Sequence, residues 1–269
     1  MLIVVKLGGK VLEENLSMLI REVKDNLSNV EFVLIHGGGS EVTHIASKMG
    51  KKQKFVTSPK GFRSRYTDKE TIEIYTMVMV GRINKRIISA LQREGICGVG
   101  LSGIDGFLVE AKRKKRIIIV DERGRKRVIQ GGYTGQICRV RSKLLKLLLN
   151  NGFVPVIAPI ALSKDFEPLN VNGDRMAAHI AGALKADKLL LLTDVSGILV
   201  DGKILSKTTT SELEKILPTL GPGMTTKAYA TIEALKLGVG EVIISSGLKD
   251  KPITSSLNQK EGGTVVNHD

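Results

Sequence analysis

The stretch that decides the fold is Leu2-Ile-Val-Val-Lys6-Leu-Gly-Gly9. Its run of apolar and β-branched residues predicts a strand that is buried on both faces. The lysine and the two glycines come at the carboxyl end of this strand, which is where open α/β sheets bind their ligands. Glycine backbone lets an anion approach closely, although a plain strand-to-helix turn is the alternative for so short a motif.

A second predicted strand, at residues 31–35, also ends in glycines, as His36-Gly-Gly-Gly39. A helix is expected to start near Ser40, so backbone N–H groups and the helix dipole could cradle a phosphoryl group there. Two such loops on adjacent strands would converge on one volume, and neither is a Walker A sequence. Gly98-Val-Gly-Leu-Ser-Gly103 has the spacing of a dinucleotide fingerprint but precedes an extended run, so we expect only a loop.

The rest of the chain alternates short apolar runs with amphipathic stretches, which is the pattern of a mainly parallel α/β sheet with helices on both faces. We expect strands at residues 2–7, 31–35, 95–100, 153–157, 188–193, 241–245 and 264–266. We expect helices at residues 13–27, 41–49, 68–94 (with Gly81 as a candidate break), 142–150, 175–184 and 224–237. Residues 51–66 read as an excursion over a ligand, and residues 107–130 as a projecting β-hairpin.

The charge is distributed unevenly along the 269 residues. Residues 1–169 carry 30 Lys and Arg against 16 Asp and Glu, a net charge of +14, whereas residues 170–269 carry 11 of each. A one-sided excess indicates an acidic partner, or else a solvated basic surface, and its end near residue 169 is the candidate boundary between two lobes. Cys97 and Cys138 lack metal-ligand spacing. Without a signal peptide or an apolar run of about 18 residues, we expect a cytoplasmic protein that does not enter a membrane.

Three later motifs bring polar or basic residues to the ends of predicted elements. In Asn170-Val-Asn-Gly-Asp174, alternation would place both asparagines and the aspartate on one side of an extended segment, with an N-cap role for Asp174 as the alternative. Thr193-Asp-Val-Ser-Gly197 ends a strand with small polar residues that suit nucleotide contacts. Gly221-Pro-Gly-Met-Thr-Thr-Lys227 puts a lysine in the first turn of a helix, which is unfavourable unless an anion compensates.

Taken in order, these five motifs resemble those of the amino acid kinase family, and within it the N-acetylglutamate kinase branch. The resemblance runs from residue 2 to residue 266 and implies a single continuous domain, a three-layer α/β/α sandwich. Residues 1–169 would bind the acyl acceptor and residues 170–269 would bind ATP. Lys6 and Lys227 would contact the transferring phosphoryl group from opposite sides, with Asp174 holding both lysines. The resemblance implies substrate contacts at Gly37, Gly38, Gly39, Arg65, Asn170 and Asn172, and ATP contacts at Lys6, Gly8, Gly9, Thr193, Asp194, Gly197 and Met224.

Such a site suits phosphoryl transfer, in which positioning and charge stabilisation dominate, and a carboxylate acceptor needs no general base. Arg65 falls where the family carries the arginine that grips the substrate α-carboxylate; a solvated charge in a basic lid is the alternative. Mg²⁺ is expected together with ATP, and we name no protein ligand for it.

Two segments, Arg63-Ser-Arg-Tyr66 and Gly131-Gly-Tyr-Thr-Gly-Gln-Ile137, depart from ordinary N-acetylglutamate kinases. They resemble the kinases of carrier-protein-dependent lysine biosynthesis, in which the C-terminal glutamate of a small acidic protein, LysW, blocks the amino group of 2-aminoadipate. We therefore expect a LysW-type carrier that docks on Arg63, Lys114, Lys115, Arg125 and Lys126. The first strand starts at once, without the N-terminal helix through which arginine-inhibited relatives form hexamers, so we expect a homodimer.

Three other functions remain open. A kinase of free N-acetylglutamate is the main alternative, while a uridylate kinase fits less well because Arg65 and the asparagines suit an amino-acid carboxylate. The basic runs also fit a nucleotide-sensing protein that binds nucleic acid, which the absence of Trp and the 4% aromatic content disfavour. Aminoadipate and glutamate differ by one methylene, worth only about 1–3 kcal/mol in a pocket, so the sequence does not choose between them.

Overall fold

The computed structural model describes residues 1–59, 61–258 and 263–269. Its centre is an eight-stranded sheet in the order β16-β18-β17-β13-β1-β2-β10-β5. These strands are β1 (Leu2–Leu7), β2 (Glu31–His36), β5 (Gly98–Ser102), β10 (Val154–Ala158), β13 (Lys188–Thr193), β16 (Lys207–Thr209), β17 (Glu241–Ser246) and β18 (Thr264–Asn267). Neighbouring strands are parallel except β17 and β18. The predicted mainly parallel sheet is therefore confirmed.

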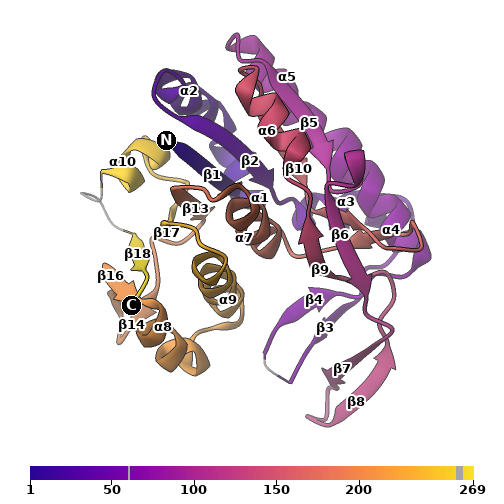
Figure 1. Cartoon of the computed structure of the whole chain (residues 1–269). Helices are drawn as coiled ribbons and strands as arrows, with labels where there is room; N and C mark the ends of the chain where they lie inside the picture. Colours follow the sequence, from indigo (N-terminus) through magenta and orange to yellow (C-terminus); the bar gives the residue numbers. More distant parts are fainter. Residues whose placement is uncertain (60, 259–262) are drawn as a thin grey trace.

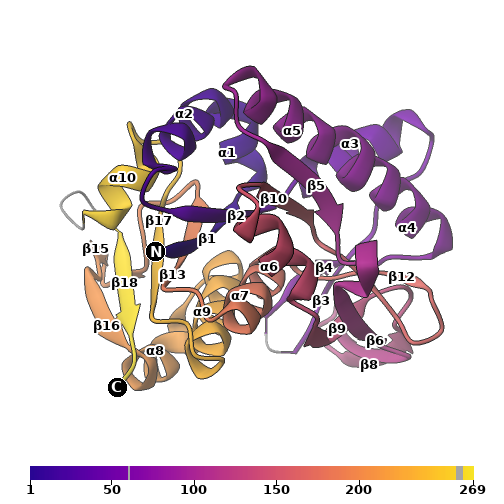
Figure 2. The ribbon, with the colours of Figure 1, turned by 45° about the horizontal axis from the view of Figure 1, so that its top comes forward.

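Helices cover both faces of this sheet (Figures 1 and 2). One face packs against α1 (Gly9–Glu14), α2 (Leu16–Asn26), α3 (Gly39–Lys48), α4 (Lys69–Thr76), α5 (Asn84–Arg93) and α10 (Pro252–Leu257). The other packs against α6 (Lys143–Asn150), α7 (Gly173–Leu184), α8 (Thr210–Ile216) and α9 (Pro222–Lys236). The fold is thus a three-layer α/β/α sandwich. In β1, Ile3 and Val5 face the first layer and Val4 faces the second, because successive strand residues point to opposite sides.

Smaller sheets lie at one end of the molecule, on the side of β10 and β5 (Figure 1). One has the order β12-β11-β6-β9, formed by Pro168–Asn170, Ile160–Leu162, Val109–Arg113 and Gly135–Val140. The other has the order β4-β3-β7-β8, formed by Arg63–Arg65, Phe55–Thr57, Arg116–Val120 and Lys126–Gln130. The predicted excursion at residues 51–66 and the predicted hairpin therefore join in one sheet. A further pair, β14 (Leu199–Val200) and β15 (Lys203–Ile204), lies in the C-terminal half.

Several predicted boundaries were wrong. The strand predicted at residues 95–100 lies at residues 98–102, at the edge of the central sheet, so the reading of residues 98–103 as a loop was wrong. The helix expected at residues 13–27 is two helices that begin at Gly9 and join at Asn15. The hairpin is confined to β7 and β8, because β6 pairs instead with β9. Helix continues across Gly81 as a π-helix, η1 (Met77–Ile83), and two short 3₁₀ turns are Asp105–Phe107 and Leu217–Thr219.

None of the helices in the described part of the chain combines the length and the hydropathy that a bilayer span requires.

Candidate functional site

Three charged side chains meet beside the carboxyl end of β1. The Nζ atom of Lys6, in β1, lies 2.8 Å from Oδ1 of Asp174, and Nζ of Lys227, in α9, lies 3.4 Å from Oδ2 of the same carboxylate. Asp174 lies in the first turn of α7, whose N-cap is Asn172. Lys227 is the sixth residue of α9 and so lies in its second turn. The prediction that it lies in the first turn was wrong. The three residues come from three separate elements, and one carboxylate bridges the two ammonium groups.

Burial and charge act in opposite directions in this cluster. Burial disfavours ionisation of Asp174, but the two lysines outweigh it and lower the pKa of Asp174 to about 2. Burial also lowers the pKa of Lys6; Asp174 opposes this shift and Lys227 adds to it. The carboxylate therefore stays ionised and holds two cations close together in a site that excludes most water. A phosphoryl group entering between the two lysines would find positive charge already in place.

The two glycine loops come together next to this cluster. A Cβ on Gly9 would lie 3.5 Å from Cα of Gly38, and a Cβ on Gly37 would lie 3.2 Å from N of Gly9. Gly8 is the N-cap of α1 and Gly38 the N-cap of α3, so the N-termini of two helices open at the same place. A Cβ on Gly173 would lie 3.7 Å from Cε of Lys6, which brings the start of α7 to the same volume.

Arg65 lies at the end of β4 and is buried against the second glycine loop. Its Nη2 atom donates to the carbonyl oxygen of Gly39 at 2.7 Å and to Oγ1 of Thr43 at 2.9 Å, and its Nη1 atom donates to Gln53. No carboxylate of the described residues forms an ion pair with Arg65. Burial lowers its pKa, which shows that the guanidinium is partly desolvated. A buried cation with only neutral partners is a candidate site for an anionic ligand.

The two asparagines predicted to bind substrate occupy different environments. Asn170, at the end of β12, donates from Nδ2 to Oγ1 of Thr67 at 3.0 Å, close in the chain to Arg65. The side chain of Asn172 accepts from N of Arg175 at 3.0 Å and so caps α7. Asp174 is thus not the N-cap, and the segment does not stay extended as far as residue 174.

The residues predicted to bind ATP divide into two groups. Thr193 ends β13 next to Gly8, and its Oγ1 atom donates to the exposed carboxylate of Asp194 at 3.1 Å. Gly197 is buried elsewhere, where a Cβ would lie 2.9 Å from Oγ1 of Thr264, and Met224 packs on the apolar layer that contains α7 and α9. Thr193 and Asp194 therefore lie near Gly8 and Lys6, whereas Gly197 and Met224 make packing contacts, and ATP contacts by all four stay a prediction.

Four of the predicted docking residues are exposed, namely Arg63, Lys115, Arg125 and Lys126. Lys114 is different, because it is half-buried and its pKa is lowered by burial and by nearby Arg175. Less of this side chain is therefore open to a partner than in the other four residues, and carrier docking by all five stays a prediction.

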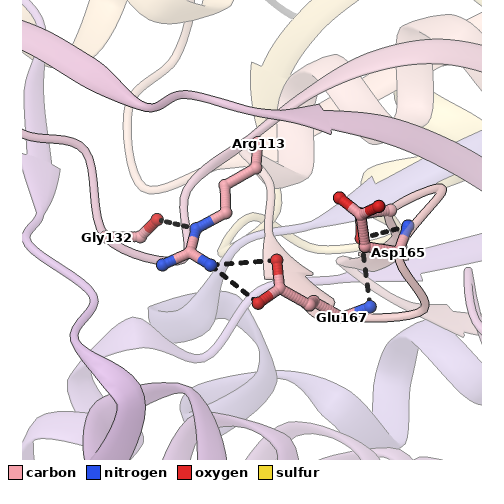
Figure 3. Close-up of polar contacts among 5 residues, drawn as sticks. Arg113, Gly132, Asp165 and Glu167 are labelled. Carbon is pink, nitrogen blue, oxygen red and sulfur yellow. Dashed lines mark hydrogen bonds and ion pairs between the residues drawn. The ribbon is translucent and has the colours of Figure 1, made fainter.

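The base of the hairpin is fixed to the body of the protein (Figure 3). Nη1 of Arg113 donates to both carboxylate oxygens of Glu167, at 2.7 and 2.9 Å, and its Nε atom donates to the carbonyl oxygen of Gly132 at 2.8 Å. The next residue, Tyr133, donates from its backbone N to the carbonyl oxygen of Thr67 at 2.7 Å. The segment at residues 131–137 therefore joins the hairpin to the Thr67–Asn170 pair.

Sequence reasoning missed the neutral partners in this site, including Thr43, Gln53 and Thr67. It also missed a contact between the excursion at residues 51–66 and α9, where the rings of Phe62 and Tyr229 lie 4.9 Å apart. Gln53 and Phe62 fall within the predicted excursion over a ligand, which was the only sequence signal for them. The other partners are set by contacts between distant segments.

Among residues 1–59, 61–258 and 263–269, no group of three or more His, Cys, Asp or Glu side chains could hold a metal ion. Mg²⁺ bound with a nucleotide needs few protein ligands, because phosphates and water supply most of its oxygens.

Comparisons with known proteins agree with the motifs. A model of the amino acid kinase family matches residues 1–246. The LysW-aminoadipate/LysW-glutamate kinase of Saccharolobus solfataricus is 44% identical over 266 residues, 98% of this chain and 99% of that protein. The protein of the same name from Sulfolobus acidocaldarius is 46% identical over 266 residues, 98% of this chain and 100% of that protein.

Solved structures share the fold at lower identity. N-acetylglutamate synthase from Neisseria gonorrhoeae has a TM-score of 0.82 at 22% identity, over 100% of this chain and 59% of that longer chain. Carbamate kinase from Giardia lamblia has a TM-score of 0.69 at 17% identity, over 100% of this chain and 98% of that one. With the family model and the full-length relatives, these likenesses establish that the chain belongs to the amino acid kinase family.

Proposed function

We propose that this protein transfers the γ-phosphoryl group of ATP to the side-chain carboxylate of 2-aminoadipate whose amino group is attached to a small acidic carrier protein of the LysW type. Glutamate on the same carrier is the second acceptor, as in the names of the two relatives. The observation that carries the chemistry is the buried pair of lysines held by one aspartate beside two glycine loops.

In the proposed reaction the attacking group is already an anion, so the protein supplies charge and position and no general base. Lys6 and Lys227 would stabilise the phosphoryl oxygens as negative charge shifts toward the leaving ADP. Asp174 holds the two lysines close together and orients them. Residues 1–169 would bind the acceptor and residues 170–269 the nucleotide, with Mg²⁺ held mainly by the phosphates of ATP.

Arg65 would bind the α-carboxylate of the acceptor. Gly39, Thr43 and Gln53 accept three of its five N–H donors, which leaves two for a ligand. Asn170 is connected to Arg65 through Thr67, whose hydroxyl accepts from Asn170 and donates to the backbone carbonyl oxygen of Arg65. Charge-assisted hydrogen bonds to a desolvated guanidinium are among the stronger polar contacts, so this side chain is a reasonable anchor for the end of the substrate that does not react.

The β4-β3-β7-β8 sheet offers a surface for the carrier. One row of residues that pair across its four strands consists of Arg63, Thr57, Val120 and Lys126. Arg63 and Lys126 therefore lie on one face, and three strand spacings put them about 14 Å apart. Arg65 is two residues after Arg63 and shares that face. Ile118 and Val128 also lie on it, as an opposed pair, and are 52% and 62% exposed. An apolar centre with basic residues around it, continuous with Arg65, suits an acidic protein that carries the substrate.

The experiment that tests the function is trapping of the acyl phosphate with hydroxylamine. ATP and Mg²⁺ are supplied with carrier-linked aminoadipate, carrier-linked glutamate or free N-acetylglutamate. We expect hydroxamate from the carrier-linked substrates and far less from the free one. Equal or better turnover of free N-acetylglutamate would favour the alternative kinase, and no hydroxamate from any of the three would reject the proposal.

The docking surface has its own test with a matched control. Arg63→Gln with Lys126→Gln should lower kcat/KM for the carrier-linked substrate, and the loss should shrink as salt rises and screens exposed charges. Lys143→Gln with Lys146→Gln removes the same charge from α6, away from β7 and β8 (Figure 1), and should leave kcat/KM unchanged. Equal effects of the two pairs would mean that only net charge matters. The homodimer and the cytoplasmic location belong to the proposal, and sedimentation of the purified protein would test the dimer.

A further inference from the structure

The side chain of His36 is completely buried at the end of β2, where the second glycine loop begins. Its Nδ1 atom lies 3.0 Å from the carbonyl oxygen of Gly37. A carbonyl oxygen can only accept, so Nδ1 carries the proton in this contact. The other ring nitrogen, Nε2, lies 3.4 Å from Nδ2 of Asn84, which is then its donor.

Asn84 is held in the orientation that this tautomer requires. Its Nδ2 atom also donates to the carbonyl oxygens of Val156 at 2.9 Å and of Leu101 at 3.4 Å, which fixes the nitrogen on that side. Its Oδ1 atom points toward Gly100, where a Cβ would lie only 2.0 Å away, so glycine at position 100 makes room for the amide. Burial lowers the pKa of His36 to about 4, with a smaller contribution from Arg86, and the ring is therefore neutral at pH 7.

The hydrogen bond to the Gly37 carbonyl oxygen also sets the direction of the next N–H group, that of Gly38. In a trans peptide the carbonyl of one residue and the N–H of the next point in opposite directions. With the Gly37 oxygen held toward His36, the N–H of Gly38 is turned to the other side. Gly38 N lies 3.5 Å from the place of a Cβ on Gly9, so that side faces the other glycine loop. The hydrogen bonds among the described residues give this N–H no protein acceptor.

The conformation of Gly38 is also restricted by its own backbone and by side chains of η1. Its φ of +143° is open only to glycine, and a Cβ there would lie 2.1 Å from Cδ1 of Ile83 and 3.3 Å from Sδ of Met79. Both side chains belong to the π-helix η1, an element that often occurs at functional sites. The loop thus has little freedom to turn its amide away.

We infer that His36 is a positioning residue, which orients the N–H of Gly38 toward the transferring phosphoryl group, and that Asn84 selects the ring tautomer that allows it. The inference rests on the proposed phosphoryl transfer. A preorganised backbone donor is most effective where charge develops in the transition state, so its effect should appear in kcat more than in the KM for ATP.

Two substitutions separate this role from simple packing. The amide nitrogen of His36→Asn can replace Nδ1, and that of His36→Gln can replace Nε2. We expect His36→Gln to lower kcat about 100-fold, with the KM for ATP changed by less than about threefold, and His36→Asn to recover most of that loss. Equal losses in the two variants, or a fall in ATP affinity as large as the fall in kcat, would overturn the inference.

A measurement on the wild-type protein does not depend on the variants folding. Nitrogen-15 NMR of the histidine rings should show His36 as the Nδ1–H tautomer at pH 7, and an Nε2–H tautomer would refute the inference. Binding of MgADP with aluminium fluoride, compared with binding of an unreactive ATP analogue, gives a second readout. His36→Gln should weaken only the former. If wild-type protein forms no acyl phosphate at all, the proposed function fails, while the tautomer still reports on His36.

Discussion

Replacement of Asp174 with asparagine tests whether one carboxylate holds the two lysines together. Asp174 forms an ion pair with Lys6 at 2.8 Å and accepts a hydrogen bond from Lys227 at 3.4 Å, and its pKa falls from 3.8 to about 2. That shift corresponds to about 2 kcal/mol of preference for the ionised form in the folded protein. The substitution removes the negative charge and leaves two ammonium groups close together in a buried site. We expect the free energy of unfolding at pH 7 to fall by about 2–4 kcal/mol and kcat by at least about 100-fold.

The assay is urea unfolding of wild type and Asp174→Asn at several pH values, together with acyl-phosphate formation at pH 7. Because the folded pKa lies below the unfolded one, the carboxylate stabilises the fold above pH 3.8, and this contribution is lost as the pH falls toward 2. The difference between the two proteins should therefore shrink over that interval. Asp201→Asn is the control, since Asp201 is exposed and its φ of +49° suits asparagine. A kcat for Asp174→Asn within threefold of wild type would refute the reasoning.

Three other predictions follow from single contacts. Arg65→Lys should raise the KM for the acceptor at least about tenfold and leave the KM for ATP unchanged, because a lysine cannot keep the bonds to Gly39 and Gln53 while binding a carboxylate. Steady-state kinetics with each substrate varied in turn would measure both KM values, and an equal rise in the two would mean that Arg65 only supports the fold. The buried neutral His36 should cost stability as the pH falls from 6.5 toward its folded pKa of about 4, by about 3 kcal/mol in total, and urea titrations of His36→Asn should lack this component. Gly38→Ala should destabilise the protein by about 1–3 kcal/mol and lower kcat, because φ there is +143° and the new Cβ meets Ile83; a thermal melt and turnover like those of wild type would show that the loop adapts.

Most of the central sheet could be predicted from sequence, because its strands are continuous apolar runs that are buried on both faces. Leu2–Leu7 and Lys188–Thr193 were predicted to the residue. The order of the motifs along the chain, through the family resemblance, also predicted that Lys6, Asp174 and Lys227 would meet. The structure shows this contact. Elements rich in glycine or short in length were harder. A strand was predicted at residues 95–100 and lies at Gly98–Ser102, where its glycines leave room for Leu91 and Asn84 of α5, a requirement that lies in the neighbour and not in the strand.

The sequence by itself determined the α/β class, the two glycine loops on β1 and β2, and the excess of positive charge in residues 1–169, because periodicity, glycine position and charge are local properties. Only the tertiary structure decided which face each basic residue occupies. It left Lys114 half-buried, and it placed Arg63 and Lys126 on one face with Arg65, through a strand pairing between segments about 60 residues apart. It likewise joined His36 to Asn84 across 48 residues. Such contacts depend on the register of strands and the packing of helices, which no local pattern of residues specifies.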